Sequence, residues 1–502
     1  MRPCIKNLFL LPVLVADLGL ILSGRATAQT FATLYSFSGG DDGYDLEAGL
    51  AISGSTLYGT TFYGGNTGNG TVFKVNTDGT GFTNLYSFTA TTYPSYTNRD
   101  GAHPSANLVL AGDTLYGTAN YGGIWGNGAL FAIKTNGTSF TNFHSFSATS
   151  GFRGPNGDGA GGAGLVVSGN TLYGNAYRGG DSGYGTIFSV NTDGTEFTTL
   201  HSFTSAANDS HTNSDGAGPH PTVILSGNVL YGTAAEGGAF ANGTVFRLNT
   251  DGTGFTNLYS FTAGNDNSLG YYTNSDGAEP WAGLVLSGGT LFGTTIFGGG
   301  SGNGTVFAVN TDGTSFRTLH NFTATSEPFN TNSDGVSPYA ELVLSGNTLY
   351  GTTPYGGNSG EGTLFAINAD GTGFTNLHAF TAESASSPYT NFDGASPKAG
   401  LLLSGYTMYG TASYGGGFGK GTVFSISFSP QLTIGPSGLD VLLAWPTNVA
   451  GFDYSGFTLQ STTNLVSPTV WTNVSPAPVV VNGQNTVTNP ISGTQQFYRL
   501  GQ

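Results

Sequence analysis

A motif that returns seven times constrains this chain more than any other feature. The string Leu-Tyr-Gly-Thr at 57–60 recurs with small changes, and successive copies lie 57 to 61 residues apart. Self-similarity at such a period is typical of repeat architectures, in which each copy is one supersecondary unit. The aromatic residue of the motif falls at Tyr58, Tyr116, Tyr173, Tyr231, Phe292, Tyr350 and Tyr409.

Each copy contains four short apolar runs, which in one copy are 284–287, 290–294, 305–310 and 316–322. The runs are rich in β-branched and aromatic residues and have the lengths of strands. Asn-Thr-Asp-Gly-Thr joins the last two runs, and we expect it to form a hairpin with a type I′ turn. Four antiparallel strands per copy are the unit of a β-propeller blade.

The composition agrees with a folded, turn-rich β protein. Glycine supplies 83 of the 502 residues, aromatic residues make up 13% and charged residues only 8%. The aromatic content provides enough apolar area to exclude a disordered chain. Glycine does not recur at every third position, which excludes collagen.

The two ends of the repeat region complement each other. A strand of the type Phe-x-x-Leu-x-x-Phe occurs at 31–37, before any blade, whereas the last copy stops after 422–427. We expect residues 31–37 to complete the last blade and so remove a free sheet edge. The predicted fold is all-β: a seven-bladed β-propeller of four-stranded blades at 29–429, closed by the N-terminal strand. An open β-solenoid is the alternative.

Residues 430–502 do not repeat and are expected to form a separate domain. Short strands and this length predict a small immunoglobulin-like or fibronectin-like β-sandwich. The expected strands are 440–445, 457–461, 479–481, 486–488 and 496–500.

Residues 1–28 have the pattern of a secretory signal peptide, with basic Arg2 and Lys6, an apolar stretch and a small-x-small cleavage site at 26–28. We therefore expect a secreted or cell-surface protein whose mature chain has no transmembrane segment. The single cysteine, Cys4, lies in this segment, so the mature chain would contain no disulfide. The formal net charge of −16 argues against a nucleic-acid partner. We expect a monomer.

The motif from Leu57 to Gly65, followed by 70–79, resembles the GloVer-type tandem repeat of secreted bacterial proteins. The resemblance covers residues 31–428. It implies export, often together with a C-terminal surface-anchoring segment, and it implies no general enzymatic activity. The segments 457–465 and 497–500 look like part of a C-terminal sandwich common on such exported proteins.

An Asp-Gly pair precedes the first strand of every copy. In a closed ring these carboxylates would surround one mouth of the channel, where oxygen ligands suit Ca²⁺. The alternative, which we favour because every copy needs the same turn, is that Asn-x-Asp-Gly only makes Asx and type I′ turns. No other cofactor is expected. The residues are Asp42, Asp100, Asp158, Asp215, Asp276, Asp334 and Asp393.

A second repeated position precedes each Gly-Gly, in a loop on the face that also carries the long connections between blades. Its aromatic residues could form a sugar-stacking rim, but a repeated position usually has a repeated structural role, which favours packing between blades. The charged residues Arg178 and Glu236 break the pattern and are therefore candidates for function. The position is occupied by Tyr63, Tyr121, Arg178, Glu236, Phe297, Tyr355 and Tyr414.

Arg99, Arg153 and Arg178 are all expected on this face, with Tyr177 and Glu236 nearby. Guanidinium groups that converge could bind a carboxylate of an acidic sugar. The alternative, which we favour, is scattered surface charge.

Three functions stay open at this point. The first is a non-catalytic exported protein that binds a glycan or cell-surface partner through the loop face. The second is a carbohydrate-active hydrolase or lyase, which would need two carboxylates in one cleft. The third is a purely structural protein of an envelope or matrix.

Overall fold

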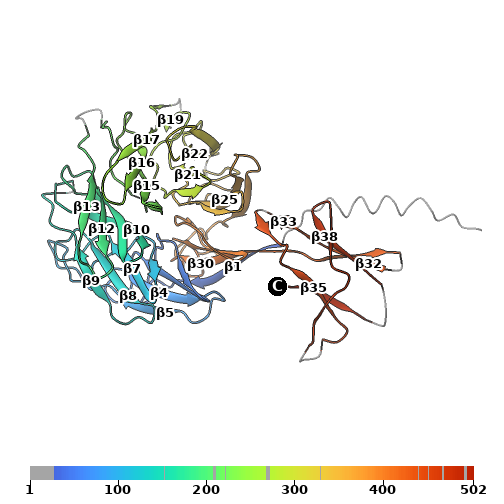
Figure 1. The fold of residues 1–502 in the computed structure, drawn as a ribbon. Coiled ribbons are helices and arrows are strands. Elements are labelled where there is room, and N and C mark those ends of the chain that lie inside the picture. The colour runs from blue at the N-terminus through green and yellow to red at the C-terminus, as the bar shows by residue number, and fades with distance from the viewer. Residues whose placement is uncertain are drawn as a thin grey trace, which may run out of the picture. The chain divides into compact units, whose positions relative to one another are not determined.

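The four apolar runs of each copy form strands that pair in chain order, as β2, β3, β4 and β5 do in the first copy (Figure 1). The structure is a computed structural model. It describes residues 28–502 except 152, 207–210, 221, 267–271, 328–329, 439, 450, 466–468 and 491–494. The predicted signal peptide, except Ala28, lies outside the described residues. All elements in the described part of the chain are strands, so the all-β prediction is confirmed.

The described chain divides into two compact units, one spanning Phe31–Ile426 and one containing Ser427–Gln502. In the first unit, each copy of the repeat corresponds to one four-stranded sheet. The first strands are β2 (Ala51–Ser53), β6 (Val109–Ala111), β10 (Ala160–Ser168), β14 (Ile224–Ser226), β20 (Val285–Ser287), β24 (Val343–Ser345) and β28 (Leu402–Ser404). The second strands are β3 (Thr56–Thr61), β7 (Thr114–Ala119), β11 (Thr171–Arg178), β15 (Val229–Ala234), β21 (Thr290–Thr295), β25 (Thr348–Thr353) and β29 (Thr407–Ala412).

The third and fourth strands complete these sheets. The third strands are β4 (Thr71–Asn76), β8 (Ala129–Lys134), β12 (Thr186–Asn191), β16 (Thr244–Asn249), β22 (Thr305–Asn310), β26 (Thr363–Asn368) and β30 (Thr422–Ser429). The fourth strands are β5 (Thr83–Ser87), β9 (Thr141–Ser145), β13 (Thr198–Ser202), β17 (Thr256–Ser260), β23 (Arg317–Asn321) and β27 (Thr375–Ala379). A small two-stranded sheet, β18 (Asn265–Asp266) and β19 (Tyr272–Thr273), lies in one connection.

The glycine of the Leu-Tyr-Gly-Thr motif has a packing role. In the first sheet, Gly59 of β3 lies opposite Phe73 of β4. A Cβ atom on Gly59 would come within 2.6 Å of the Phe73 ring. The ring therefore lies over bare backbone, and the same glycine–phenylalanine contact recurs in the other copies, for example between Gly117 and Phe131.

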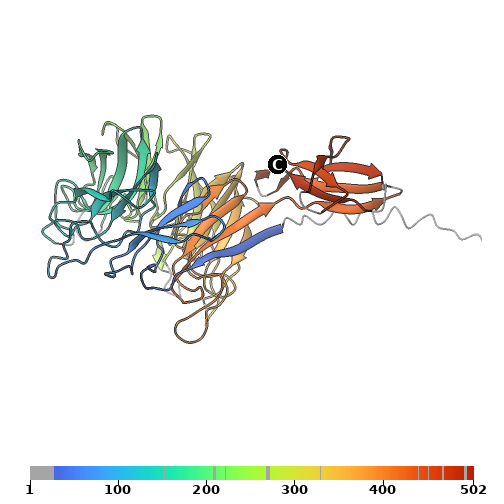
Figure 2. The same ribbon diagram turned by 90° about the horizontal axis from the view of Figure 1, so that it is seen from below.

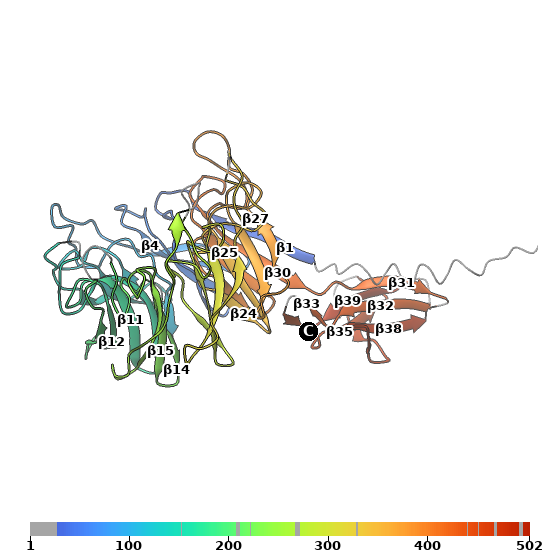
Figure 3. The same ribbon diagram turned by 90° about the horizontal axis from the view of Figure 1, so that it is seen from above.

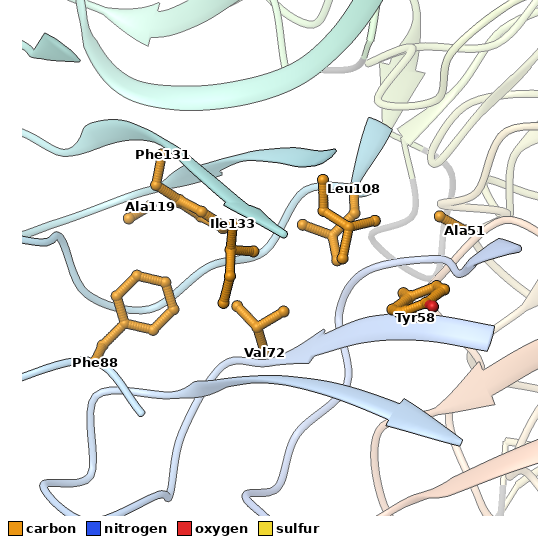
Figure 4. Close-up of a cluster of buried hydrophobic side chains, with 9 residues drawn as sticks. Ala51, Tyr58, Val72, Phe88, Leu108, Ala119, Phe131 and Ile133 are labelled. Atoms are coloured by element: carbon orange, nitrogen blue, oxygen red, sulfur yellow. The ribbon is translucent and has the colours of Figure 1, made fainter. Parts of the chain in front are cut away.

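Neighbouring sheets share their cores. Val72 and Phe88 of the first copy pack with Leu108 and Phe131 of the second, as Figure 4 shows. The ring of Tyr86 also stacks on Phe140 of the next copy with the centroids 3.8 Å apart. Burial of one such large apolar side chain stabilises the fold by about 1.5–3 kcal/mol. Figure 3 shows these sheets standing next to one another.

The N-terminal strand β1 (Ala28–Ser36) occupies the fourth place in the last sheet, beside β30 (Figure 2). Contacts between the first and last copies continue beyond this strand. The hydroxyl of Thr411 donates to the carbonyl of Ala48 at 3.0 Å, and Ser413 donates to Leu46 at 2.9 Å. Phe37 is fully buried in a cluster that contains residues of both copies.

The predicted hairpins between third and fourth strands are present, but the predicted type I′ turn is wrong. The amide of Gly79 donates to the carbonyl of Asn76 at 2.9 Å, and Asn76 in turn donates to Thr80. Only Gly79 in this turn has a positive φ, of 83°. A type I turn followed by a left-handed glycine, which forms a bulge, explains this geometry. The Asp78 carboxylate accepts from the amide of Thr80 at 2.9 Å and so stabilises the turn.

The C-terminal unit has its own strands and core. The expected strands are found as β32 (Asp440–Pro446), β35 (Thr458–Thr462), β37 (Val479–Val481), β38 (Gln484–Pro490) and β39 (Phe497–Gly501). The additional strands are β31 (Thr433–Ser437), β33 (Asn448–Val449), β34 (Phe452–Asp453) and β36 (Thr472–Asn473). They form the sheets β31-β32-β38-β37, β36-β35-β39 and β33-β34. Leu443 and Trp445 are fully buried in a cluster with Leu459 and Val487, whose strands belong to the two larger sheets.

In the described part of the chain, no helical segment has the length and apolar character that crossing a membrane requires.

Candidate binding cavity

A cavity of about 440 Å³ lies where the segments that precede the first strands converge. Every copy of the repeat contributes to its wall. The lining residues are Glu47, Ser105, Ala106, Asn107, Asn120, Tyr121, Gly161, Gly162, Gly164, Tyr177, Arg178, His220, Thr222, Trp281, Ala282, Gly283, Tyr339, Ala340, Glu341, Tyr355, Lys398, Ala399 and Gly400.

One position of the repeat supplies most of the chemical variety. It lies five residues after the aspartate of each Asp-Gly pair. In the third copy the segment is one residue shorter, and glycines 161, 162 and 164 line the cavity instead. A side chain that differs at an otherwise repeated position indicates a role specific to one copy of the repeat. The residues at this position are Glu47, Ser105, His220, Trp281, Tyr339 and Lys398.

Backbone hydrogen bonds to the segment before the first strand, or to the first strand itself in the third copy, hold the residues before each Gly-Gly in place. Tyr121 exchanges two hydrogen bonds with Ala102, at 2.8 and 3.1 Å, and Arg178 is paired with Ala160 at the end of β11. The aromatic side chains at this position are partly exposed. Any packing between blades therefore leaves part of each side chain accessible. Their exposed fractions are 37% for Tyr63, 43% for Tyr121, 42% for Phe297, 48% for Tyr355 and 44% for Tyr414.

Arg153, Tyr177, Arg178 and Glu236, four of the five residues considered as a possible cluster, lie in or beside the cavity, although scattered surface charge was the favoured interpretation. Nη2 of Arg153 donates to both carboxylate oxygens of Glu236, at 2.8 and 2.9 Å. The hydroxyl of Tyr177 donates to the same carboxylate at 2.9 Å. Arg178 lies in the cavity wall, where burial and, to a smaller extent, the charge of Arg153 lower its pKa. Arg99 is exposed and lies outside this wall.

One side of the cavity is aromatic. The rings of His220 and Trp281 have centroids 4.4 Å apart, and Tyr339 meets Trp281 edge-on at 5.8 Å. Nε1 of Trp281 donates to Glu279 at 3.1 Å, which fixes the orientation of the indole. Burial lowers the pKa of His220 to about 4, so its imidazole is neutral at pH 7.

The other side is charged. Nζ of Lys398 lies 3.8 Å from Asp45 and 3.5 Å from Glu47. Burial opposes the charge of Lys398, but the two carboxylates outweigh it and raise the lysine pKa. Glu341 lies in another part of the wall, against Gly283 of the segment that carries Trp281, and its carboxylate has no ion-pair or hydrogen-bond partner among the described residues. Burial raises the pKa of Glu341 to about 7.

Each Asp-Gly carboxylate accepts hydrogen bonds from the strand that precedes it in the chain, which is β1 for Asp42 and the fourth strand of the preceding copy for the others. Asp393 accepts hydrogen bonds from Nε2 of His378 at 3.0 Å and from the amide of Thr381 at 3.0 Å. The other six make the same contacts, with a tyrosine hydroxyl replacing histidine in some copies. These bonds give each carboxylate a structural partner. Within the described residues, no three His, Cys, Asp or Glu side chains are placed to hold a metal ion. Calcium binding stays a prediction.

The sequence did not point to Trp281, His220, Tyr339, Glu341 or Lys398 as site residues. The signal that could have found them is the variation at the fifth residue after each Asp-Gly aspartate. Glu341 stands two residues further on, where most other copies have glycine.

Comparison with solved structures gives distant likenesses. A GH74 enzyme of Niastella koreensis has 14% identity and a TM-score of 0.45, covering 94% of this chain and 72% of that chain. A puromycin-hydrolyzing peptidase of Mycobacterium tuberculosis has 11% identity and a TM-score of 0.44, with coverages of 83% and 61%. An oligogalacturonate lyase in complex with manganese has 11% identity and a TM-score of 0.43, with coverages of 81% and 94%. No curated protein matches the chain significantly.

Comparison with family models gives a clear result. The model of the Gloeobacter/Verrucomicrobia repeat matches residues 15–166, 149–274 and 265–465. These matches span far more than half of the 502 residues and include the repeated strands and the segments that line the cavity. The chain therefore belongs to the Gloeobacter/Verrucomicrobia repeat family.

Proposed function

We propose that this chain is an exported, non-catalytic, seven-bladed β-propeller that binds a glycan or a cell-surface component in its cavity. The signal-peptide pattern of residues 1–28 supports export. Contacts between copies support a closed ring in which β1 completes the last blade. Tyr35 of β1 stacks on Phe82 of the first copy at 4.0 Å, and Phe31 of β1 stacks on His378 of the sixth copy at 4.0 Å. The same stacked pair links the intervening copies.

The observation that carries the proposal is that one cavity takes a different side chain from each of six repeats at the same position. A purely structural ring would need the same residue at each copy of this position. The cavity volume of about 440 Å³ falls within the range of sites for small ligands. Trp281 and Tyr339 offer aromatic surface for the apolar face of a sugar ring, whereas Asn107 and Glu47 offer polar atoms for hydroxyl groups.

The test is a glycan array followed by calorimetry of the best glycan, with the mature chain. We expect Trp281→Ala to weaken binding about tenfold, because the loss of one stacked aromatic contact costs up to about 1.5 kcal/mol and about 1.4 kcal/mol corresponds to a factor of ten. Trp125→Ala is the matched control, because Trp125 is 55% exposed and lies outside the cavity wall. Equal loss in both variants, or no binding to any glycan or cell-wall polymer, would contradict the proposal.

A carbohydrate-active enzyme is the second candidate, and Glu341 is the observation that favours it. A carboxyl group with a pKa of about 7 in a cavity is suited to general acid catalysis. This candidate predicts new reducing ends from a polysaccharide mixture and their loss in Glu341→Gln. Activity that survives Glu341→Gln would rule out this residue as the acid.

A further inference from the structure

The charged side chains in and around the cavity differ in whether the protein neutralises them. Lys398 is paired with Asp45 and Glu47, and Arg153 is paired with Glu236. Glu341 has no such partner among the residues that the structure describes. Glu341 is partly buried and lines the cavity, and its carboxylate, when ionised, loses hydration there without gaining a partner. A group that carries such a cost in a cavity is suited to receiving a ligand atom.

The carboxylate of Glu341 lies against the segment that carries Trp281. A Cβ atom built on Gly283 would come within 3.1 Å of Oε2 of Glu341, so the carboxylate lies against the bare backbone of Gly283. Gly283 follows Trp281 by two residues, and Tyr339 precedes Glu341 by two. All four residues line the cavity.

A carboxylate next to aromatic faces has a specific chemical preference. The carboxylate accepts charge-assisted hydrogen bonds from an ammonium group. The faces of tryptophan and tyrosine attract the same cation through their quadrupoles. The local charge also favours a cationic ligand, because five carboxylates lie in or next to the cavity wall and only three basic side chains do. The acidic residues are Asp45, Glu47, Glu236, Glu279 and Glu341, and the basic residues are Arg153, Arg178 and Lys398.

We infer that the cavity takes a saccharide with a free ammonium group, such as a de-N-acetylated hexosamine unit, and that Glu341 binds this group beside Trp281 and Tyr339. The inference rests on the proposed glycan-binding function and adds the charge of the ligand. The competing ligand is an acidic sugar held by Arg178, and the experiment distinguishes the two.

The experiment is calorimetry of the mature chain with three oligosaccharides: glucosamine oligomers, N-acetylglucosamine oligomers of the same length, and oligogalacturonides. We expect the glucosamine oligomer to bind at least about tenfold more tightly than its acetylated counterpart, as one charged hydrogen bond predicts. This comparison uses the unmodified protein, so it does not depend on whether a variant folds.

The residue is tested with Glu341→Gln. We expect this variant to bind the glucosamine oligomer no more tightly than the acetylated oligomer. Glu196→Gln, in an exposed hairpin, is the matched control and should keep the preference.

Equal affinity for the two hexosamine oligomers, or tighter binding of the oligogalacturonide, would overturn the inference and leave glycan binding intact. A preference for the free amine that persists in Glu341→Gln would also overturn it. The absence of binding to every glycan on the array would instead overturn the proposed function itself.

Discussion

At the residue scale, one carboxylate in each repeat holds the turn that follows the fourth strand. Burial opposes ionisation of Asp393, but hydrogen bonds from His378 and Thr381 outweigh it and lower the aspartate pKa. Asp393→Asn replaces an acceptor oxygen by a donor that faces other donors. We expect a loss of about 2 kcal/mol in the free energy of unfolding, measured by denaturant titration at pH 7. The control, Asp78→Asn in an exposed turn, should cost much less, and an equal loss would contradict the assignment.

Glu341 provides a second prediction at this scale, with the opposite sign of pH dependence. Its pKa is raised to about 7 in the folded protein, whereas an exposed glutamate has a pKa of about 4.3. The folded state therefore binds the proton more tightly, and this stabilisation is complete below pH 4.3 and lost as the pH rises through 7. We expect Glu341→Gln to raise the free energy of unfolding by about 1–3 kcal/mol at pH 8.5 relative to its effect at pH 4.5. Melting curves of both proteins at the two pH values measure this, and a pH-independent difference would contradict it.

At the element scale, β1 can be compared with the fourth strands that lie within the chain. Phe37 follows β1 as Phe88 follows β5, and both rings are fully buried. If β1 completes the last blade, Phe37→Ala should cost the same free energy of unfolding as Phe88→Ala, about 3–4 kcal/mol. Denaturant titration of the two variants measures this directly. A small loss for Phe37→Ala beside a full loss for Phe88→Ala would show that the N-terminal strand does not close the ring.

The strands themselves follow closely from the sequence, because apolar runs and turn residues are local signals. The expected run 305–310 is strand β22 to the residue, and 479–481 is strand β37. The type I′ turn was wrong because Asp-Gly fits two hairpins, and the longer connection here selects the one with a single left-handed glycine, Gly79. The cavity could be predicted only in part. Arg178 breaks a repeated sequence pattern and can be noticed from the sequence. Glu341 is placed in the cavity by its contact with Gly283 of another copy, which the sequence does not show.

At the scale of the whole molecule, the repeats are alike in their cores and different where they meet the cavity. Each sheet needs the same glycine–phenylalanine contact, so the motif that carries it hardly varies. The segments before the first strands contribute His220, Trp281 and Lys398 from three different copies to one space. The proposed closed ring would therefore have one asymmetric site and not one site per repeat.

This arrangement predicts the stoichiometry of binding. Because the cavity is shared by all copies, we expect one ligand per chain, whereas sites formed by the repeated Tyr-Gly-Gly loops would bind several. Native mass spectrometry or calorimetry with the best array glycan counts the bound molecules. Binding should also change the fluorescence of Trp281, and Trp281→Phe should remove that change while Trp125→Phe keeps it. Several equivalent ligands per chain would contradict a single shared cavity. A ligand-induced fluorescence change that persists in Trp281→Phe would place binding on the loops, because the exposed Trp125 lies in one of them.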